Sequence, residues 1–129
     1  MTIFNHVQIK VSDLEKSRKF YSSVMDVLGY HVVLEIENSV VGYGTSVHDM
    51  FEIRQATQEA LVSQSVHVAF NAIDKKCVDL FYLIALKNGA TCNGKPGYRS
   101  EYEEGYYAAF VIDPDGNNIE VVYSVTWHR

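Results

Sequence analysis

The sequence has few cysteines and no long apolar run. Its 129 residues include only two cysteines, Cys77 and Cys92, which do not stand in a Cys-x-x-Cys spacing. We therefore expect two free thiols in a reducing compartment and no disulfide framework. No stretch approaches the roughly 20 apolar residues that a membrane helix needs. The first residues also lack the charged and apolar regions of a signal peptide, so we expect a cytoplasmic protein with no membrane partner.

An excess of basic residues is also missing. The formal net charge is −5, the isoelectric point is about 5.4, and no basic run is visible. Because nucleic-acid binding rests largely on lysine and arginine contacts to phosphate, this charge balance argues against nucleic acid as a partner. Apolar residues nonetheless make up 47% of the chain, which is enough for the packed core of one ordinary domain.

The chain repeats part of its own sequence. Residues 6–21 recur at 67–82, 61 residues later, with His, Val, Asp, Phe and Tyr matching in one register. A glycine follows each copy, at Gly29 and Gly89, one residue out of phase. Five matches in a single register indicate two tandem copies of one structural unit.

Each copy is expected to begin as a strand and continue as a helix. The apolar residues of 6–11 alternate with a period of two, as in a half-buried strand. Asp13 can then cap a helix over 14–28, and Gly29 can end it. The second copy repeats this pattern with a strand over 66–72, a cap at Asp74, a helix over about 75–88 and a stop at Gly89.

Three short strands are expected after each helix. The last two strands of the second half are joined by Asp113-Pro114-Asp115-Gly116, a strong turn signal whose counterpart in the first half spans 45–49. Residues 93–105 remain as the longest loop. The six strands are placed near 30–37, 39–44, 49–56, 90–93, 106–112 and 118–125.

These elements define the expected fold class. We predict one α+β domain, residues 1–129, made of two tandem βαβββ repeats at about 4–57 and 65–125. The two repeats would form a concave mixed β-sheet with the helices on its outer face.

Strand alternation sorts the polar side chains by face. The apolar residues of each first strand must lie under the neighbouring helix, so the polar residues face away from it. In each half, a histidine at the start of the unit and a glutamate in its last strand project from this helix-free face. Two imidazoles and two carboxylates on one surface suit a divalent metal ion. The four residues are His6, Glu52, His67 and Glu120.

Further polar and aromatic residues are candidates for substrate binding. Gln8, Lys10, Arg54 and Asn71 share the helix-free face, where they either contact substrate or only solvate the cavity wall. The long loop carries an aromatic cluster that would form either a lid over the pocket or a packed loop or dimer contact. The cluster consists of Tyr98, Arg99, Tyr102, Tyr106 and Tyr107, of which Tyr98, Arg99 and Tyr107 are the expected substrate contacts.

The sequence resembles the glyoxalase, bleomycin-resistance and extradiol dioxygenase superfamily, also called the vicinal-oxygen-chelate superfamily. The resemblance covers essentially the whole chain and is carried by HVQIKVSDLEKSRKFYSSVMDVLGY, FEIRQ, HVAFNA and DPDGNNIEVVY. It implies that His6, Glu52, His67 and Glu120 stand at metal-ligand positions, as in glyoxalase I (lactoylglutathione lyase), with Ni, Zn, Mn or Co as the ion. It also implies a homodimer whose sites each draw His6 and Glu52 from one chain and His67 and Glu120 from its partner.

The number of ligands narrows the expected chemistry. A dioxygenase of this fold needs about three open metal positions, and a fourth protein ligand at Glu52 would leave only two. That favours lyase or isomerase chemistry on a small substrate that chelates the metal through two adjacent oxygens. Glu120 is our first choice for the catalytic carboxylate that moves the proton, and Glu52 is the second.

Two residues depart from the glyoxalase I pattern. Lys10 stands where glutathione-using members have arginine, and Ala56 stands where they have asparagine. Both positions contact glutathione in the family, which places that substrate in doubt. Two alternatives therefore remain open: a metal-free, drug-sequestering protein of the bleomycin-resistance kind, and a thiol transferase of the fosfomycin-resistance kind.

Overall fold

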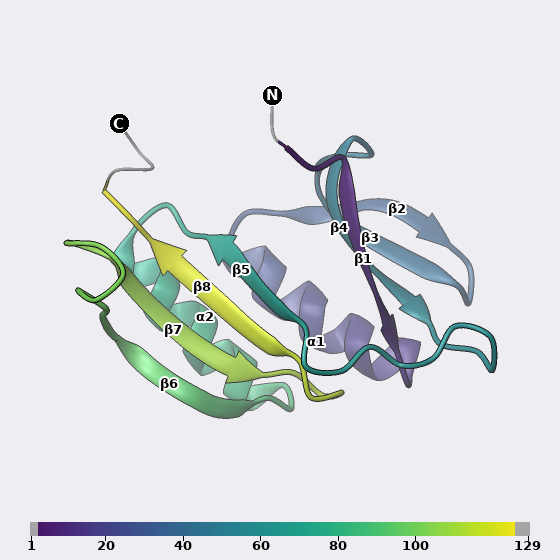
Figure 1. Ribbon diagram of the computed structural model, residues 1–129. Helices are drawn as coiled ribbons and strands as arrows, with labels where there is room; N and C mark the ends of the chain where they lie inside the picture. The colour runs from purple at the N-terminus through teal and green to yellow at the C-terminus, as the bar shows by residue number, and fades with distance from the viewer. Residues whose placement is uncertain (1–2, 126–129) are drawn as a thin grey trace. The chain divides into compact units, whose positions relative to one another are not determined.

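The computed structural model describes residues 3–125 and contains the two expected βαβββ units (Figure 1). The division into two compact units falls between Gln64 and Ser65. The first unit contains β1 (His6–Val11), α1 (Leu14–Val27), β2 (His31–Ile36), β3 (Val40–Ser46) and β4 (Asp49–Gln55). The second contains β5 (His67–Asn71), α2 (Lys75–Lys87), β6 (Thr91–Tyr98), β7 (Tyr107–Ile112) and β8 (Asn118–Tyr123).

Each unit forms its own four-stranded mixed sheet, which confirms the predicted fold class. The strand order is β1-β4-β3-β2 in the first unit and β5-β8-β7-β6 in the second. In each sheet the first and last strands of the unit pair in parallel, and the other pairs are antiparallel. The register is also equivalent, because Gln8 lies opposite Glu52 and Ala69 lies opposite Glu120. Each helix packs against its own sheet (Figure 1).

Both helices begin and end at the predicted residues or one position away. Asp13 and Asp74 each accept a hydrogen bond from the backbone N–H three residues on, at 3.2 and 2.8 Å, as N-cap side chains do. After each helix the backbone turns left-handed, with φ of +83° at Gly29 and +105° at Gly89. Glycine takes this conformation without steric cost, so both stop signals are confirmed.

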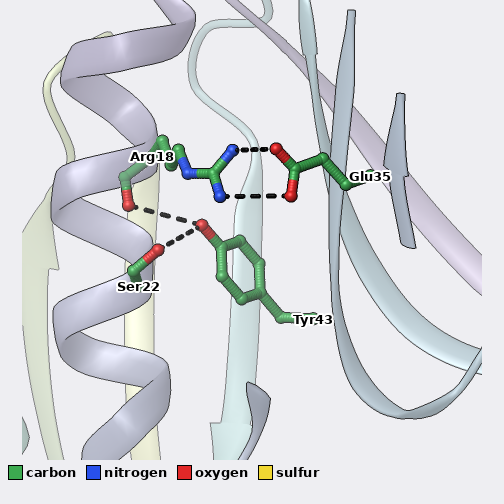
Figure 2. A network of polar contacts seen from close by, with 4 residues as sticks. All are labelled: Arg18, Ser22, Glu35 and Tyr43. Atoms are coloured by element: carbon green, nitrogen blue, oxygen red, sulfur yellow. Dashed lines mark hydrogen bonds and ion pairs between the residues drawn. The ribbon is translucent and has the colours of Figure 1, made fainter. Parts of the chain in front are cut away.

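Polar contacts fasten α1 to the sheet of the first unit (Figure 2). The Arg18 guanidinium donates two hydrogen bonds to the Glu35 carboxylate, at 2.7 and 3.3 Å, and thereby lowers the pKa of Glu35. The buried Tyr43 hydroxyl lies 2.8 Å from the Ser22 hydroxyl and donates to the Arg18 carbonyl at 3.3 Å. Burial raises the pKa of Tyr43. These contacts join α1 to both β2 and β3.

The predicted turn between β7 and β8 is built around one buried carboxylate. Asp113 accepts hydrogen bonds from the backbone N–H groups of Asp115 and Asn117, each at 2.9 Å. Gly116 supplies a φ of +95° between them. The side-chain oxygen of Asn117 accepts from the Val66 N–H at 3.0 Å, so the turn also fixes the chain just before β5.

One predicted loop proved wrong in part. Residues 93–98 were expected in the long loop, but β6 continues to Tyr98, and the connecting segment begins at Arg99. Gly94, Pro96 and Gly97 are typical of loops, yet β6 is the edge strand of its sheet, where bulges and proline are tolerated. The bounds of the other elements differ from the prediction by no more than two residues. Neither helix described in residues 3–125 has the length and apolar character needed to cross a membrane.

Candidate functional site

A histidine–glutamate pair lies on the helix-free face of the second unit. His67 Nε2 lies 2.9 Å from Glu120 Oε1, and the Glu120 side chain is only 4% exposed while that of His67 is 54% exposed. Glu120 faces Ala69 across the parallel pair of β5 and β8, two residues along the strand from His67. Because Ala69 carries only a methyl group, the carboxylate is free to bond the imidazole.

Three further residues, from β7 and from the segment that joins it to β6, lie near Glu120. The Arg99 N–H donates to the Tyr106 carbonyl at 2.8 Å, so the two residues stand opposite each other. The Tyr106 hydroxyl donates to Glu120 Oε2, and burial together with this bond raises the pKa of Tyr106. Phe110 lies opposite Glu120 in the register, with its ring centroid 6.2 Å from that of His67. The Arg99 guanidinium lies 5.4 Å above the Phe110 ring.

Two glycines leave room for the Arg99 side chain. A Cβ atom at Gly97 would stand 3.1 Å from Arg99 Nη1, and one at Gly94 would stand 3.3 Å from Nη2 and 3.0 Å from the Phe110 ring. The carbonyl of Lys95 accepts a hydrogen bond from Nη2 at 2.7 Å. The guanidinium is thus fixed in place through one of its donors, and its planar fork is suited to bind an anionic group.

The first unit joins three of its predicted residues, Glu52, Gln8 and Lys10, in one chain of hydrogen bonds, and His6 has a separate contact with Asn5. Glu52, which is 6% exposed, accepts a hydrogen bond from Gln8 Nε2 at 2.7 Å. Lys10 Nζ in turn donates to Gln8 Oε1 at 2.6 Å. His6 Nδ1 lies 2.8 Å from the Asn5 side-chain oxygen, which leaves Nε2 as the ring nitrogen without this contact.

Two of the expected substrate contacts lie elsewhere. The Tyr98 hydroxyl accepts a hydrogen bond from Lys75 Nζ at 2.6 Å, and the Tyr107 hydroxyl donates to Asp79 Oδ1 at 2.6 Å. The bond to Asp79 raises the pKa of Tyr107 to about 12. Lys75 and Asp79 belong to α2, so both hydroxyls bind the helix and the structure does not bring them to Glu120.

The remaining predicted residues are exposed. Arg54 and Asn71 are exposed on β4 and β5, and the Tyr102 ring packs edge-on against Tyr106 with centroids 5.3 Å apart. The bond between Tyr106 and Glu120 was not predicted from the sequence. Strand alternation carried a signal for it, because neighbouring residues point to opposite faces and Tyr107 points to α2.

A protein-bound metal ion usually has three or four side-chain ligands. Across residues 3–125, no group of three or more His, Cys, Asp or Glu side chains is arranged to hold a metal ion. Each unit taken by itself supplies one imidazole and one buried carboxylate. The 2.9 Å between His67 Nε2 and Glu120 Oε1 suits two neighbouring ligands, because donors about 2.1 Å from an ion and at right angles lie about 3 Å apart. An imidazole nitrogen and a carboxylate oxygen are donor types that a divalent ion accepts, and each unit by itself supplies fewer than the three or four protein ligands of a usual site.

The comparisons with known proteins identify the family. Residues 3–121 match the Glyoxalase/Bleomycin resistance protein/Dioxygenase superfamily, so the chain belongs to this superfamily. Its members often bind divalent metals. A crystal structure of a glyoxalase/bleomycin resistance protein from Albidiferax ferrireducens is 29% identical, with a TM-score of 0.84 over 95% of this chain and 99% of that chain.

More distant structures share the fold. A glyoxalase/bleomycin resistance protein/dioxygenase family enzyme from Burkholderia phytofirmans is 19% identical, with a TM-score of 0.71 over 94% of this chain and 98% of that chain. A lactoylglutathione lyase from Agrobacterium tumefaciens is 21% identical, with a TM-score of 0.66 over 98% of this chain and 96% of that chain. No curated protein matches the chain.

Proposed function

We propose that this protein is a divalent-metal-dependent, glyoxalase-like enzyme that moves a proton within a small, anionic, oxygenated substrate. One observation carries the proposal. The buried Glu120 carboxylate stands 2.9 Å from His67 Nε2 on a face that also holds the Arg99 guanidinium. A carboxylate beside an imidazole supplies metal ligands and a proton acceptor, and a fixed guanidinium supplies a charge for substrate binding.

The proposed metal ligands are His6, Glu52, His67 and Glu120, and the ion is Ni, Zn, Mn or Co. A divalent ion bound by these residues would act as a Lewis acid on two adjacent substrate oxygens. The position of His6 supports this assignment, because the second ring nitrogen of a metal-binding histidine usually lies beside an oxygen, and His6 Nδ1 lies 2.8 Å from the Asn5 side-chain oxygen. The equivalent register of the two units places the carboxylates at matching strand positions.

Each side chain of the site then has a proposed role in the reaction or in substrate binding. Glu120 takes the proton from the carbon next to the substrate carbonyl and returns it to the neighbouring atom, with Glu52 as the second choice for this role. Arg99 binds the anionic group of the substrate. We propose that Gln8, Lys10, Arg54 and Asn71 form a polar wall, and that Tyr98 and Tyr107 hold the β6–β7 hairpin against α2.

We also propose that two copies of the chain form a homodimer with composite sites, as the family resemblance implies. A dimer in sedimentation at micromolar concentration is the expected result, and a monomer there would contradict it.

Cys77 and Cys92 are both free thiols, which supports a reducing cytoplasm as the proposed location.

A second candidate function is a metal-free binding protein of the drug-sequestering kind. The position of the Arg99 guanidinium above Phe110 favours it, because this cation would serve an anionic ligand equally well without a metal. Metal content separates the two proposals.

The deciding experiment is metal analysis of protein purified without an affinity tag, with and without added Ni²⁺, Zn²⁺ or Mn²⁺. We expect a bound divalent ion in the wild type and sharply lower occupancy in His6→Ala, His67→Ala and Glu120→Ala. The matched control is His31→Ala, because this histidine is an exposed residue of β2. Undetectable metal under all three additions would reject the enzyme proposal in favour of the binding protein.

A further inference from the structure

We infer that Tyr106 is a positioning residue for Glu120, whose hydroxyl holds one carboxylate oxygen so that only the other is offered beside His67. The inference rests on the metal site proposed above. Tyr106 donates to Glu120 Oε2, whereas His67 Nε2 approaches Oε1. The two oxygens of one carboxylate therefore have different partners.

The environment of Glu120 explains why such a donor is needed. The residue is 3% exposed, so each carboxylate oxygen requires a hydrogen-bond partner to offset the loss of water. The terminal torsion of a glutamate is broad, and by itself it would let either oxygen, or both, face His67. A fixed donor on Oε2 removes that freedom.

The hydroxyl of Tyr106 is itself fixed from several sides. The backbone carbonyl of Tyr106 accepts a hydrogen bond from the Arg99 N–H at 2.8 Å, and the backbone N–H of Tyr106 donates to the Glu103 carbonyl at 3.1 Å. The ring packs against Tyr102 and against a buried cluster formed by Ala108, Phe110 and Val122. The donor thus reaches Glu120 from a position set by both backbone and packing.

The bond from Tyr106 would limit how Glu120 binds a metal ion. With Oε2 held by Tyr106, Glu120 offers a single oxygen to an ion that also binds His67. Without that hydroxyl, the carboxylate is free to turn or to offer both oxygens, which changes the coordination of the ion. Groups that hold a metal ligand from behind typically alter metal affinity by about 10- to 100-fold.

The test compares two neighbouring tyrosines that undergo the same chemical change. Tyr106→Phe removes the hydroxyl on Glu120, and Tyr107→Phe removes the hydroxyl on Asp79. Calorimetric titration with Co²⁺ should show about 10- to 100-fold weaker binding in Tyr106→Phe and unchanged binding in Tyr107→Phe. The visible absorption of the Co²⁺-loaded protein should also change in Tyr106→Phe alone, because that spectrum reports the coordination of the ion.

The outcomes separate this inference from the proposed function. Wild-type affinity and an unchanged spectrum in Tyr106→Phe would overturn the inference and leave the metal site standing. Equal weakening in both variants would show a general loosening of the hairpin and would also overturn it. A wild-type protein that binds no Co²⁺ would reject both. Should Tyr106→Phe not fold by circular dichroism, Tyr106→Met fills the space with a flexible apolar side chain and is titrated in the same way, with the same expected loss.

Discussion

Gln8 donates a hydrogen bond to Glu52 across the parallel pair of β1 and β4, at 2.7 Å. The equivalent position in the second unit is Ala69, opposite Glu120. A methyl group cannot donate, so Glu120 is held by Tyr106 and His67. The two units therefore keep a buried glutamate at the same register position but satisfy it with different donors.

Replacing Gln8 by leucine should destabilise the protein. The change keeps much of the side-chain volume but removes the donor to Glu52, whose side chain is buried. Losing one partner of a buried acceptor costs about 1–3 kcal/mol. Urea unfolding at pH 7 measures this loss, with Gln64→Leu at an exposed position as the control. Equal stability of Gln8→Leu and the wild type would show that the bond to Glu52 contributes nothing.

The N-cap of α2 should give a pH-dependent contribution to stability. The backbone N–H of Cys77 lowers the pKa of Asp74 from its ordinary value of 3.8. A lowered pKa means that the ionised cap stabilises the fold above the ordinary value and that this contribution is lost as the pH falls through the lowered value. The difference in melting temperature between the wild type and Asp74→Ala should therefore narrow between pH 7 and about pH 3. The exposed Glu59 provides a control as Glu59→Ala, and a difference that stays constant with pH would contradict the prediction.

The hydroxyl of Tyr43 should stabilise the first unit (Figure 2). Tyr43→Phe removes its bonds to Ser22 and to the Arg18 carbonyl, and we expect a loss of about 1 kcal/mol in urea unfolding at pH 7. Burial raises the pKa of Tyr43, so the stabilisation is fully present below pH 10 and is lost as the pH rises through the raised value. Repeating the unfolding at about pH 11 should bring the two proteins closer together. A difference that grows at high pH would contradict this account.

Glu120→Gln should separate metal binding from catalysis. The amide keeps an oxygen that can bind the ion but cannot accept a proton, so turnover of an α-hydroxycarbonyl or hemithioacetal substrate should be abolished while metal is partly retained. Parallel assays of Glu52→Gln test the second choice for the base. Full turnover in Glu120→Gln, with a total loss in Glu52→Gln, would reverse the two roles.

The hemithioacetal of methylglyoxal and glutathione should be a poor substrate or none. Lys10 and Ala56 stand where the resemblance to glyoxalase I would place arginine and asparagine. In addition, Lys10 Nζ is bonded to Gln8 Oε1 at 2.6 Å, which leaves it less available to a substrate carboxylate. A spectrophotometric assay with added Ni²⁺, Zn²⁺ or Mn²⁺ checks this. Strong turnover would make the protein a glutathione-using glyoxalase I despite both departures.

The features that follow from local sequence were predicted well. Asp13 and Gly29 mark the ends of α1 because capping and left-handed turns depend on a few neighbouring residues. The extent of β6 was missed because its glycines resemble a loop, and only the β7 partner strand makes them part of a sheet. Long-range contacts could not be predicted either: the hydroxyls of Tyr98 and Tyr107 bind Lys75 and Asp79, which lie more than 20 residues away in the sequence.

The equivalent register of β1–β4 and β5–β8 makes each half of this chain an internal reference for the other. Each strand position of the first unit has a counterpart in the second unit of the same chain, so the two positions are always present at the same concentration and under the same conditions. Gln8 and Ala69 are one such pair of matched positions, and they already carry different residues in this sequence. Scanning matched positions two at a time would therefore separate what the βαβββ architecture demands from what each glutamate individually requires.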